Sequence, residues 1–291
     1  MSRPLPLAAL AIAGCPMFPA DNPWNQRVDR LPPHPRSGAI IGAIGNDRTV
    51  HPDFGSGRYE GRRIGIPYKV VPRGQRKVRV RFDYADESDR GPYPIPRNPP
   101  IEGGGDRHVL LVQRGACRLY ELFAAERSGA SWTAGSGAIW NLRSNHVRPR
   151  GWTSADAAGL PILPGLARYP EVRRGAIRHA LRFTVQRTRK DFVYPARHFA
   201  SSLTDADLPR MGERLRLKSG VDPKSFPRQA RVVVRALKRY GMLLADNGSS
   251  IYVSGAPSPG WDNDDLRTLG RLRGSDFEVV DTSALPKPRG G

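Results

Sequence analysis

The sequence predicts a mainly β (α+β) fold, with an antiparallel β-sandwich or jelly-roll-like core and a few helices, mostly toward the C-terminus. Three observations favour this fold class. Short segments that alternate or run apolar like strands recur along the chain. Neither an internal repeat nor the regular strand–helix alternation of parallel α/β folds is present. The 31 glycines and 28 prolines are scattered without a period, which indicates many turns.

Strand signals follow one another through most of the chain. Residues 77–83 alternate basic and apolar side chains, as in a strand with one solvated face. Hairpins are expected around Arg114-Gly115 and, over residues 242–254, around Asp246-Asn247-Gly248. The other expected strands span residues 66–71, 107–113, 118–123, 178–186, 191–194 and 277–281.

Two helices are expected late in the chain. Residues 229–240 place apolar side chains on one face and are followed by Gly241, a residue type that commonly ends helices. Residues 262–272 carry acidic residues at their N-terminal end, where negative charge stabilises a helix.

The chain divides into a leader-like or lipobox segment, residues 1–15, and a single globular domain, residues 16–291. In an exported protein, the cysteine pair Cys15 and Cys117 favours a disulfide, worth up to ~4–5 kcal/mol for a loop of about 100 residues. The alternative, a lipid anchor on Cys15, would leave Cys117 unpaired. We therefore expect a secreted or cell-envelope protein of bacterial type.

The formal net charge is +20, with 40 Arg and 7 Lys spread along the whole length. No zinc-finger, RNP-like or helix-turn-helix pattern accompanies this charge, so nucleic acid is not the expected partner. A polysaccharide, in particular an acidic one, would be attracted by the positive electrostatic field of this surface. No apolar run approaches the roughly 20 residues of a transmembrane segment. We expect a monomer without a cofactor or a metal.

An acid/base pair is predicted on the first hairpin. If its loop holds two residues, Arg114 and Gly115, then His108 lies opposite Glu121 and Asp106 falls on the same face. A carboxylate beside an imidazole suits general acid/base catalysis. A one-residue slip would separate the groups, and a structural His–Glu pair is the alternative.

A second carboxylate is expected from Asp86 or Glu87, in the acidic cluster before a Pro-rich loop. Glycoside hydrolysis generally needs two carboxylates, whose separation sets the stereochemistry. Plain solvation of an acidic turn, or a calcium site without EF-hand spacing, would account for the same residues.

Residues 132–169 show neither a helical nor a strand period over most of their length, and we interpret them as an ordered surface region that builds a site. Aromatic faces stack on sugar rings, and amides and guanidinium groups bond hydroxyls or carboxylates. Core filling is the alternative for the two tryptophans. The predicted sugar-binding residues in this region are Trp140, Asn141, Arg143, Asn145 and Trp152.

A further cluster, Tyr194, Arg197 and His198, combines a phenol, a guanidinium and an imidazole. Such groups abstract the proton alpha to a uronate carboxylate in lyases, while the arginine neutralises that carboxylate. His179 and Arg182 form a similar pair. Structural hydrogen bonding by half-buried histidines is the alternative.

The chain resembles a family of exported bacterial proteins of uncharacterised activity. The segments that carry the resemblance cover nearly the whole chain from Cys15 onward and include FPADNPWN, AGSGAIWNLRSN, WTSADAAGLPILPGL, HALRF and PARHFAS. The resemblance implies export and a single unit, and it favours a glycan role because relatives occur beside carbohydrate-binding modules. It implies no role for any particular residue.

These observations favour an exported enzyme that cleaves a polysaccharide, as a glycoside hydrolase or a polysaccharide lyase. The expected catalytic residues are Glu121, His108, Asp106, Asp86 and Glu87. The alternative is a non-catalytic glycan- or cell-envelope-binding protein. A third hypothesis is a metalloenzyme that uses His108, Glu121 and a distant histidine such as His51 or His198.

Overall fold

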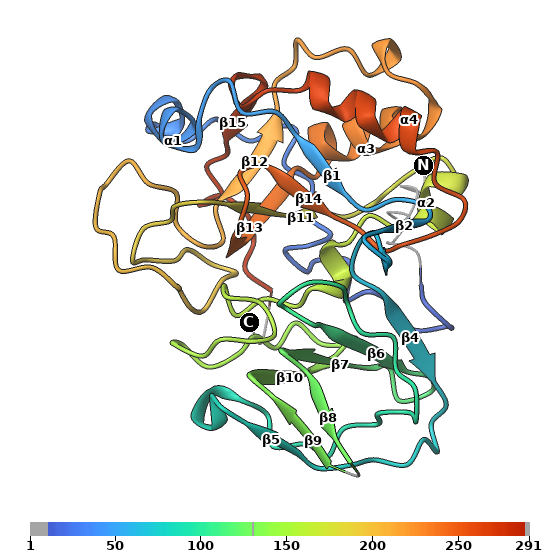
Figure 1. Ribbon diagram of the computed structural model, residues 1–291. Coiled ribbons are helices and arrows are strands. Elements are labelled where there is room, and N and C mark those ends of the chain that lie inside the picture. Colours follow the sequence, from blue (N-terminus) through green and yellow to red (C-terminus); the bar gives the residue numbers. More distant parts are fainter. Residues whose placement is uncertain (1–10, 130, 289–291) are drawn as a thin grey trace, which may run out of the picture.

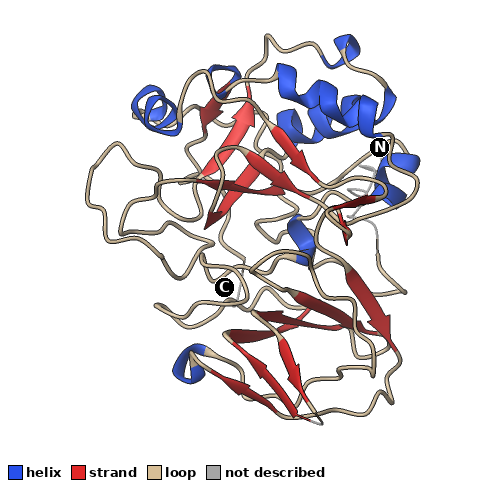
Figure 2. Ribbon diagram, viewed as in Figure 1, coloured by secondary structure: helices blue, strands red, loops and turns tan. Residues whose placement is uncertain are grey.

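The chain folds into several β-sheets with a few helices at their margins, as the computed structural model shows for residues 11–129 and 131–288 (Figures 1 and 2). Strands account for 26% of the structure and helices for 17%, which confirms the predicted mainly β (α+β) class. Residues 1–10, which hold most of the leader-like segment, lie outside the described residues.

The upper part of the molecule in Figure 1 is built on a six-stranded sheet. Its strand order is β1 (His51–Asp53), β14 (Tyr252–Ser254), β11 (Leu181–Val185), β13 (Met242–Asn247), β12 (Arg214–Leu217) and β15 (Phe277–Val279). The sheet is mixed, because β11 runs parallel to β13 and antiparallel to β14. All five residues of β11 are buried, as expected for a central strand covered on both faces.

The expected hairpin over residues 242–254 is wrong. Both of its arms are strands, but β11 lies between them in the sheet. The first four residues of β13 are buried, so this strand gains more from a central place between β11 and β12 than from a partner on one side only.

The lower part contains two smaller sheets. The four-stranded sheet has the order β10 (Ser136–Asn141), β7 (Arg118–Phe123), β6 (Val109–Gln113) and β4 (Tyr68–Val71). The three-stranded sheet has the order β5 (Val80–Phe82), β9 (Ser131–Ala134) and β8 (Glu126–Ser128). An apolar cluster that includes Val109, Leu111 and Trp132 joins residues of both sheets, so this part resembles a small sandwich. A two-stranded hairpin, β2 (Arg58–Tyr59) and β3 (Arg62–Arg63), completes the strands.

The first predicted hairpin forms with a different register. Gln113 pairs with Arg118, and Leu110 with Glu121, so the loop holds four residues rather than two. The whole pairing therefore shifts by two residues, and Glu121 loses His108 as its direct partner. Because the side-chain period of a strand is two, His108 and Glu121 still point to the same face.

In the part of the chain that the structure describes, four α-helices lie at the margins of the sheets: α1 (Ser37–Ile44), α2 (Tyr169–Arg173), α3 (Arg228–Arg239) and α4 (Asn263–Arg267). Short 3₁₀ segments lie at Ala85–Glu87, Leu163–Gly165, Pro223–Ser225, Thr268–Arg271 and Gly274–Asp276. The predicted helix over 229–240 is α3, and its first N–H groups, on Gln229 and Ala230, donate to the carboxylate of Asp265 at 2.8 and 2.7 Å. A carboxylate at this end satisfies unpaired donors and the helix dipole together.

The predicted surface region, residues 132–169, is largely buried. It begins with β9 and β10, and of residues 154–168 all but Ala157 are buried. Its backbone bonds both halves of the molecule, since Ala158 N–H donates to Ala245 O of β13 and Leu163 N–H donates to Glu121 of β7. The segment is non-periodic because its polar groups pair with neighbours in both sheets, which no regular element would allow.

The expected strand over residues 191–194 is reduced to an isolated bridge between Phe192 and Met211. The predicted disulfide is confirmed: Cys15 and Cys117 are joined, 102 residues apart, so the Cys15 sulfur is occupied. No helix in residues 11–129 or 131–288 is both long and apolar enough to cross a bilayer.

Candidate functional site

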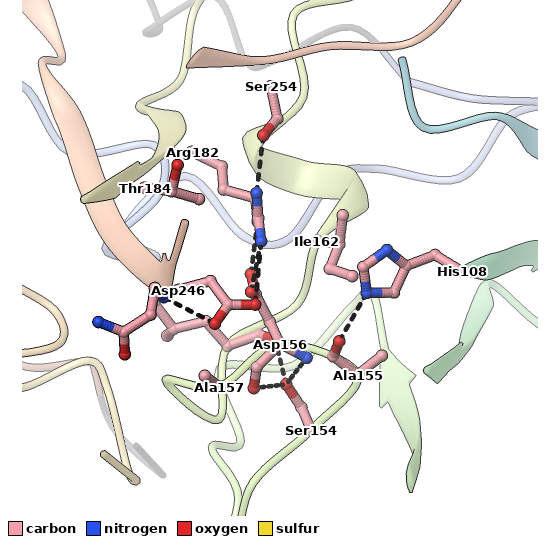
Figure 3. Close-up of polar contacts among 12 residues, drawn as sticks. His108, Ser154, Ala155, Asp156, Ala157, Ile162, Arg182, Thr184, Asp246 and Ser254 are labelled. Carbon is pink, nitrogen blue, oxygen red and sulfur yellow. Dashed lines mark hydrogen bonds and ion pairs between the residues drawn. The ribbon is translucent and has the colours of Figure 1, made fainter. Parts of the chain in front are cut away.

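A buried ion pair holds the six-stranded sheet to the segment that crosses the interior. Arg182 of β11 donates from Nε and Nη2 to the two oxygens of Asp156, both at 2.7 Å, and from Nη1 to Ser254 at 2.7 Å (Figure 3). Although burial opposes ionisation, Asp156 raises the pKa of Arg182 further above its usual range. Bidentate pairing of this kind fixes orientation as well as position.

His108 forms the next link toward the surface. Its Nε2 donates to Ala155 O at 2.9 Å, beside Asp156 in the chain (Figure 3), and its Nδ1 contacts Glu102 Oε2. Burial alone would favour the neutral imidazole, but the charge of Glu102 outweighs it and raises the pKa of His108 to about 9. Since both ring nitrogens face acceptors, the group is an imidazolium at neutral pH.

Glu102 lies in a Pro- and Gly-rich loop that closes on itself. The Glu102 N–H donates to His108 O at 3.0 Å, and Pro99, Pro100 and three glycines flank it. Burial opposes ionisation of Glu102, but the adjacent His108 outweighs it and lowers the pKa of the Glu102 carboxyl. The carboxylate is 15% exposed and faces a cleft.

This cleft has a volume of about 850 Å³, a size typical of ligand sites. Strand β1 supplies His51 and Asp53, β14 supplies Tyr252, and the β2–β3 hairpin supplies Tyr59 and two arginines. Glu102 and the two glycines that follow it form part of the same wall. We call this hollow the central cleft.

Asp53 is placed by the pairing of β1 and by the residue that follows it. The strand runs parallel to β14 with His51 beside Tyr252, whose rings stack at 4.2 Å. Phe54 then packs on Trp261 and against Gly255, where a Cβ atom would lie 2.4 Å from the Phe54 ring. Only glycine leaves room for this packing, which anchors Asp53 from the C-terminal side.

Three carboxyl groups line the central cleft, and two of them, Asp53 and Glu102, have pKa values that are shifted in opposite directions. Burial raises the pKa of Asp53, and the negative charges of Glu102 and Asp106 raise it further. The pKa of Glu102 is lowered. Asp53 therefore keeps its proton to a higher pH than Glu102 does. Two carboxyl groups whose pKa values are pushed apart in one site are suited to act as acid and base.

Aromatic faces line the same cleft. Tyr59 is 71% exposed on the β2–β3 hairpin, and the stacked pair His51 and Tyr252 belongs to the same lining. Flat, partly exposed rings with polar edges suit contact with a sugar.

Glu102, Asp106 and His108 also offer one ligand atom each within 4.8 Å of one another, a donor set that suits a divalent cation. In the observed arrangement, however, the two ring nitrogens of His108 donate to Glu102 and to Ala155 O. A cation would have to displace the Nδ1 proton, so the arrangement is better described as a hydrogen-bonded ion pair.

Glu121, the predicted acid/base partner of His108, has a different role. It is fully buried, and it accepts N–H bonds from Ile162 at 3.0 Å, Leu163 at 2.9 Å and the Trp140 indole at 3.2 Å. Burial raises the pKa of Glu121 to about 7. It holds the 3₁₀ turn of residues 163–165 onto β7 and does not line the central cleft, so we do not retain it as a catalytic residue.

Of the other predicted catalytic residues, His108 and Asp106 lie beside Glu102, whereas Asp86 and Glu87 do not. Asp86 is exposed in the 3₁₀ segment Ala85–Glu87. Glu87 accepts from Thr153 N–H at 2.8 Å, which makes it a support of the 132–169 segment. Neither residue lines the central cleft.

The predicted sugar-binding residues of the 132–169 segment also lie elsewhere. Trp140 is buried, and with Asn145 it lines a hollow of only about 20 Å³. Asn141 and Arg143 are exposed, with Arg143 N–H donating to the Asn141 side chain. Trp152 is half-buried, with the Arg148 guanidinium 5.4 Å from its ring. Core filling, the alternative interpretation, fits Trp140.

The residues of the predicted lyase cluster do not line the central cleft. Tyr194 lines a separate hollow near the C-terminal segment. Arg197 donates to Arg148 O at 2.9 Å, and His198 bonds Ala157 O at 2.8 Å. His179 bonds Glu171 at 3.1 Å, away from Arg182. These contacts tie loops together.

The residues of the central cleft that sequence reasoning missed are Asp53, Tyr59, Glu102 and Tyr252, whereas His51 was named only as a distant metal ligand. Asp53 and Glu102 both lie in turn-rich stretches, HPDFGSG and PPIEGGG, in which an acidic residue stands beside glycines. That setting was a signal for carboxylates on tightly bent backbone at a site. A scan of protein-family models found no matching family, and searches of curated proteins and of solved structures found no match.

Proposed function

We propose that the protein is an exported carbohydrate-active enzyme that hydrolyses a polysaccharide in the central cleft, with Asp53 as the general acid and Glu102 as the ionised carboxylate. The supporting observation is that these two carboxyl groups line one cleft together with exposed aromatic rings. The opposed directions of their pKa shifts assign the roles.

In this mechanism, Asp53 donates its proton to the glycosidic oxygen as the bond breaks. Glu102 stabilises the positive charge that develops on the sugar and either attacks the anomeric carbon or activates a water. His108 is a positioning residue, because it touches Glu102 but does not line the cleft. Tyr59 and Tyr252 hold the sugar ring by stacking.

The test is mass spectrometry of products after incubation with neutral and uronic-acid polysaccharides. Hydrolysis adds one water to each new pair of fragments. We expect Asp53→Asn and Glu102→Gln to lose turnover by at least roughly 10²-fold while retaining binding. Asp86→Asn is the matched control, since this exposed carboxylate lies outside the cleft and its variant should turn over normally.

Each other outcome contradicts the proposal in a definite way. Unsaturated fragments would mean β-elimination, so the enzyme would be a lyase. Binding without fragments from any glycan would support the non-catalytic glycan-binding protein. Loss of activity in Asp86→Asn, with Asp53→Asn unaffected, would move the site back to the acidic cluster.

A further inference from the structure

A second hollow adjoins the central cleft at the β2–β3 hairpin. It has a volume of about 690 Å³ and shares Arg62, Arg63, Glu102 and Gly103 with the lining of the central cleft. The two hollows therefore meet at Glu102. We call the second hollow the basic groove.

The lining of the basic groove carries more positive charge than negative charge. Its lining includes one acidic residue, Glu102, and five basic ones: Arg58, Arg62, Arg63, Lys69 and Arg107. Among the ion pairs of the described residues, none involves any of these five. Arg58 and Arg107 each donate to a backbone oxygen, at Gly61 and Ala125.

Most of the basic side chains of the groove are accessible to a ligand. Arg58, Arg62, Arg63 and Lys69 are exposed, and they come from three short strands, β2, β3 and β4. Unpaired cations along the walls of a groove attract a polyanion, and they bond carboxylate or sulfate groups directly.

We propose that the substrate is an acidic polysaccharide that runs through both hollows past Glu102, with its anionic groups bound by the arginines and the lysine of the basic groove. This inference rests on the proposed function, and it names the substrate class. Because Glu102 lines both hollows and each hollow continues along residues that the other lacks, the chain is cut internally.

A glycan fits this path better than a nucleic acid. Glu102 lines both hollows and Asp53 lines the central cleft, and a phosphate beside Glu102 would be repelled by it. A polynucleotide carries a charge on every unit, whereas a glycan of alternating charged and neutral sugars places a neutral sugar at the carboxylates.

Binding to the Asp53→Asn variant tests the inference, because no hydrogen bond of the described residues involves the Asp53 side chain and turnover is not needed. The probes are hexasaccharides of hyaluronan and unsulfated chondroitin, in which charged and neutral sugars alternate, compared with neutral malto- and xylohexaose. Titration calorimetry at about 50 and 200 mM salt should show that at least one acidic probe binds more tightly than both neutral ones and weakens with salt.

Adding Arg58→Gln and Lys69→Gln, at two residues that line the basic groove and not the central cleft, should weaken the acidic probe by roughly 5- to 30-fold and leave the neutral probes unchanged. The matched control adds Arg235→Gln and Arg239→Gln, two exposed arginines of α3 that line a different hollow, and should change nothing. Equal affinity for acidic and neutral probes, equal loss in both pairs of variants, or tighter binding of a thymidine 20-mer would each overturn the inference. If the acidic probe binds and the two substitutions weaken its binding as expected, but the protein cleaves no polysaccharide, the proposed hydrolase activity is refuted. The inference that the basic groove binds an acidic glycan then stands.

Discussion

Replacement of His108 by glutamine tests the ion pair on which the central cleft depends. The imidazole is 1% exposed, and its pKa rises from an ordinary 6.5 to about 9 through its contact with Glu102. At pH values between 6.5 and about 9, His108 keeps a proton in the folded protein that it has lost in the unfolded chain. The stabilisation is therefore complete below about pH 6.5 and disappears as pH rises through about 9.

The size of the effect follows from that interval. Each pKa unit is worth about 1.4 kcal/mol, so the shift corresponds to roughly 3 kcal/mol of unfolding free energy. His108→Gln removes this pH-dependent stabilisation and leaves Glu102 without its cation, at a cost of about 3–5 kcal/mol at pH 7. We expect the difference between wild type and variant to shrink to about 1–2 kcal/mol near pH 9.5.

Urea unfolding between pH 7 and 9.5, followed by tryptophan fluorescence, measures this difference. The window avoids most of the titration of Glu121 and Asp246, whose pKa values burial raises to about 7. His146→Gln is the control, because His146 is exposed and its variant should stay within about 0.5 kcal/mol of wild type. A constant difference between wild type and His108→Gln across the window would refute the ion pair.

Three further predictions concern the framework. Glu121→Gln should lower the unfolding free energy by about 1–3 kcal/mol, because the NH₂ group of its new amide faces N–H donors, yet it should leave kcat nearly unchanged. Urea unfolding and steady-state kinetics check these two expectations. A collapse of kcat in folded protein would restore Glu121 to the site. Arg182→Met should cost about 3–5 kcal/mol by leaving Asp156 charged and unpaired, and Asp156→Leu in the same chain should recover much of it; additive losses in a double-mutant cycle would argue against the pair. Reduction of Cys15–Cys117 should lower stability by up to ~4–5 kcal/mol, seen as a lower urea midpoint in dithiothreitol, and an unchanged midpoint would contradict this.

Elements with strong local signals were predictable from the sequence. The helix α3 lies within one residue of its predicted ends, because the apolar period and Gly241 both mark it. The strands β6 and β7 also lie where their apolar runs predict. Strand partners were less predictable, since β11 enters the sheet between β13 and β14 from about 60 residues earlier in the chain. Only the packing of the whole sheet decides that arrangement.

The site was predictable only in part, for a similar reason. His108 was identified because the assumed hairpin register placed its imidazole opposite the Glu121 carboxylate, but its observed partner, Glu102, lies six residues away across a loop. The local turn length set the predicted pairing with Glu121, and a loop two residues longer removed it. Asp53 comes from β1, about 50 residues before Glu102, so nothing in the local sequence links the two carboxylates.

The buried segment of residues 154–168 explains why the molecule retains the Arg182–Asp156 ion pair, although apolar residues could replace such a pair at little cost in stability. Arg182 fixes Asp156, and the neighbouring Ala155 carbonyl then accepts from His108, which in turn holds Glu102 at the cleft. The two sheets are thus joined by a series of directional bonds that ends at the proposed catalytic carboxylate. An apolar replacement would preserve the contact between the sheets but would leave the Ala155 carbonyl, and with it the orientation of Glu102, free to vary. Arg182→Met with Asp156→Leu should therefore fold and yet lose kcat more than substrate affinity.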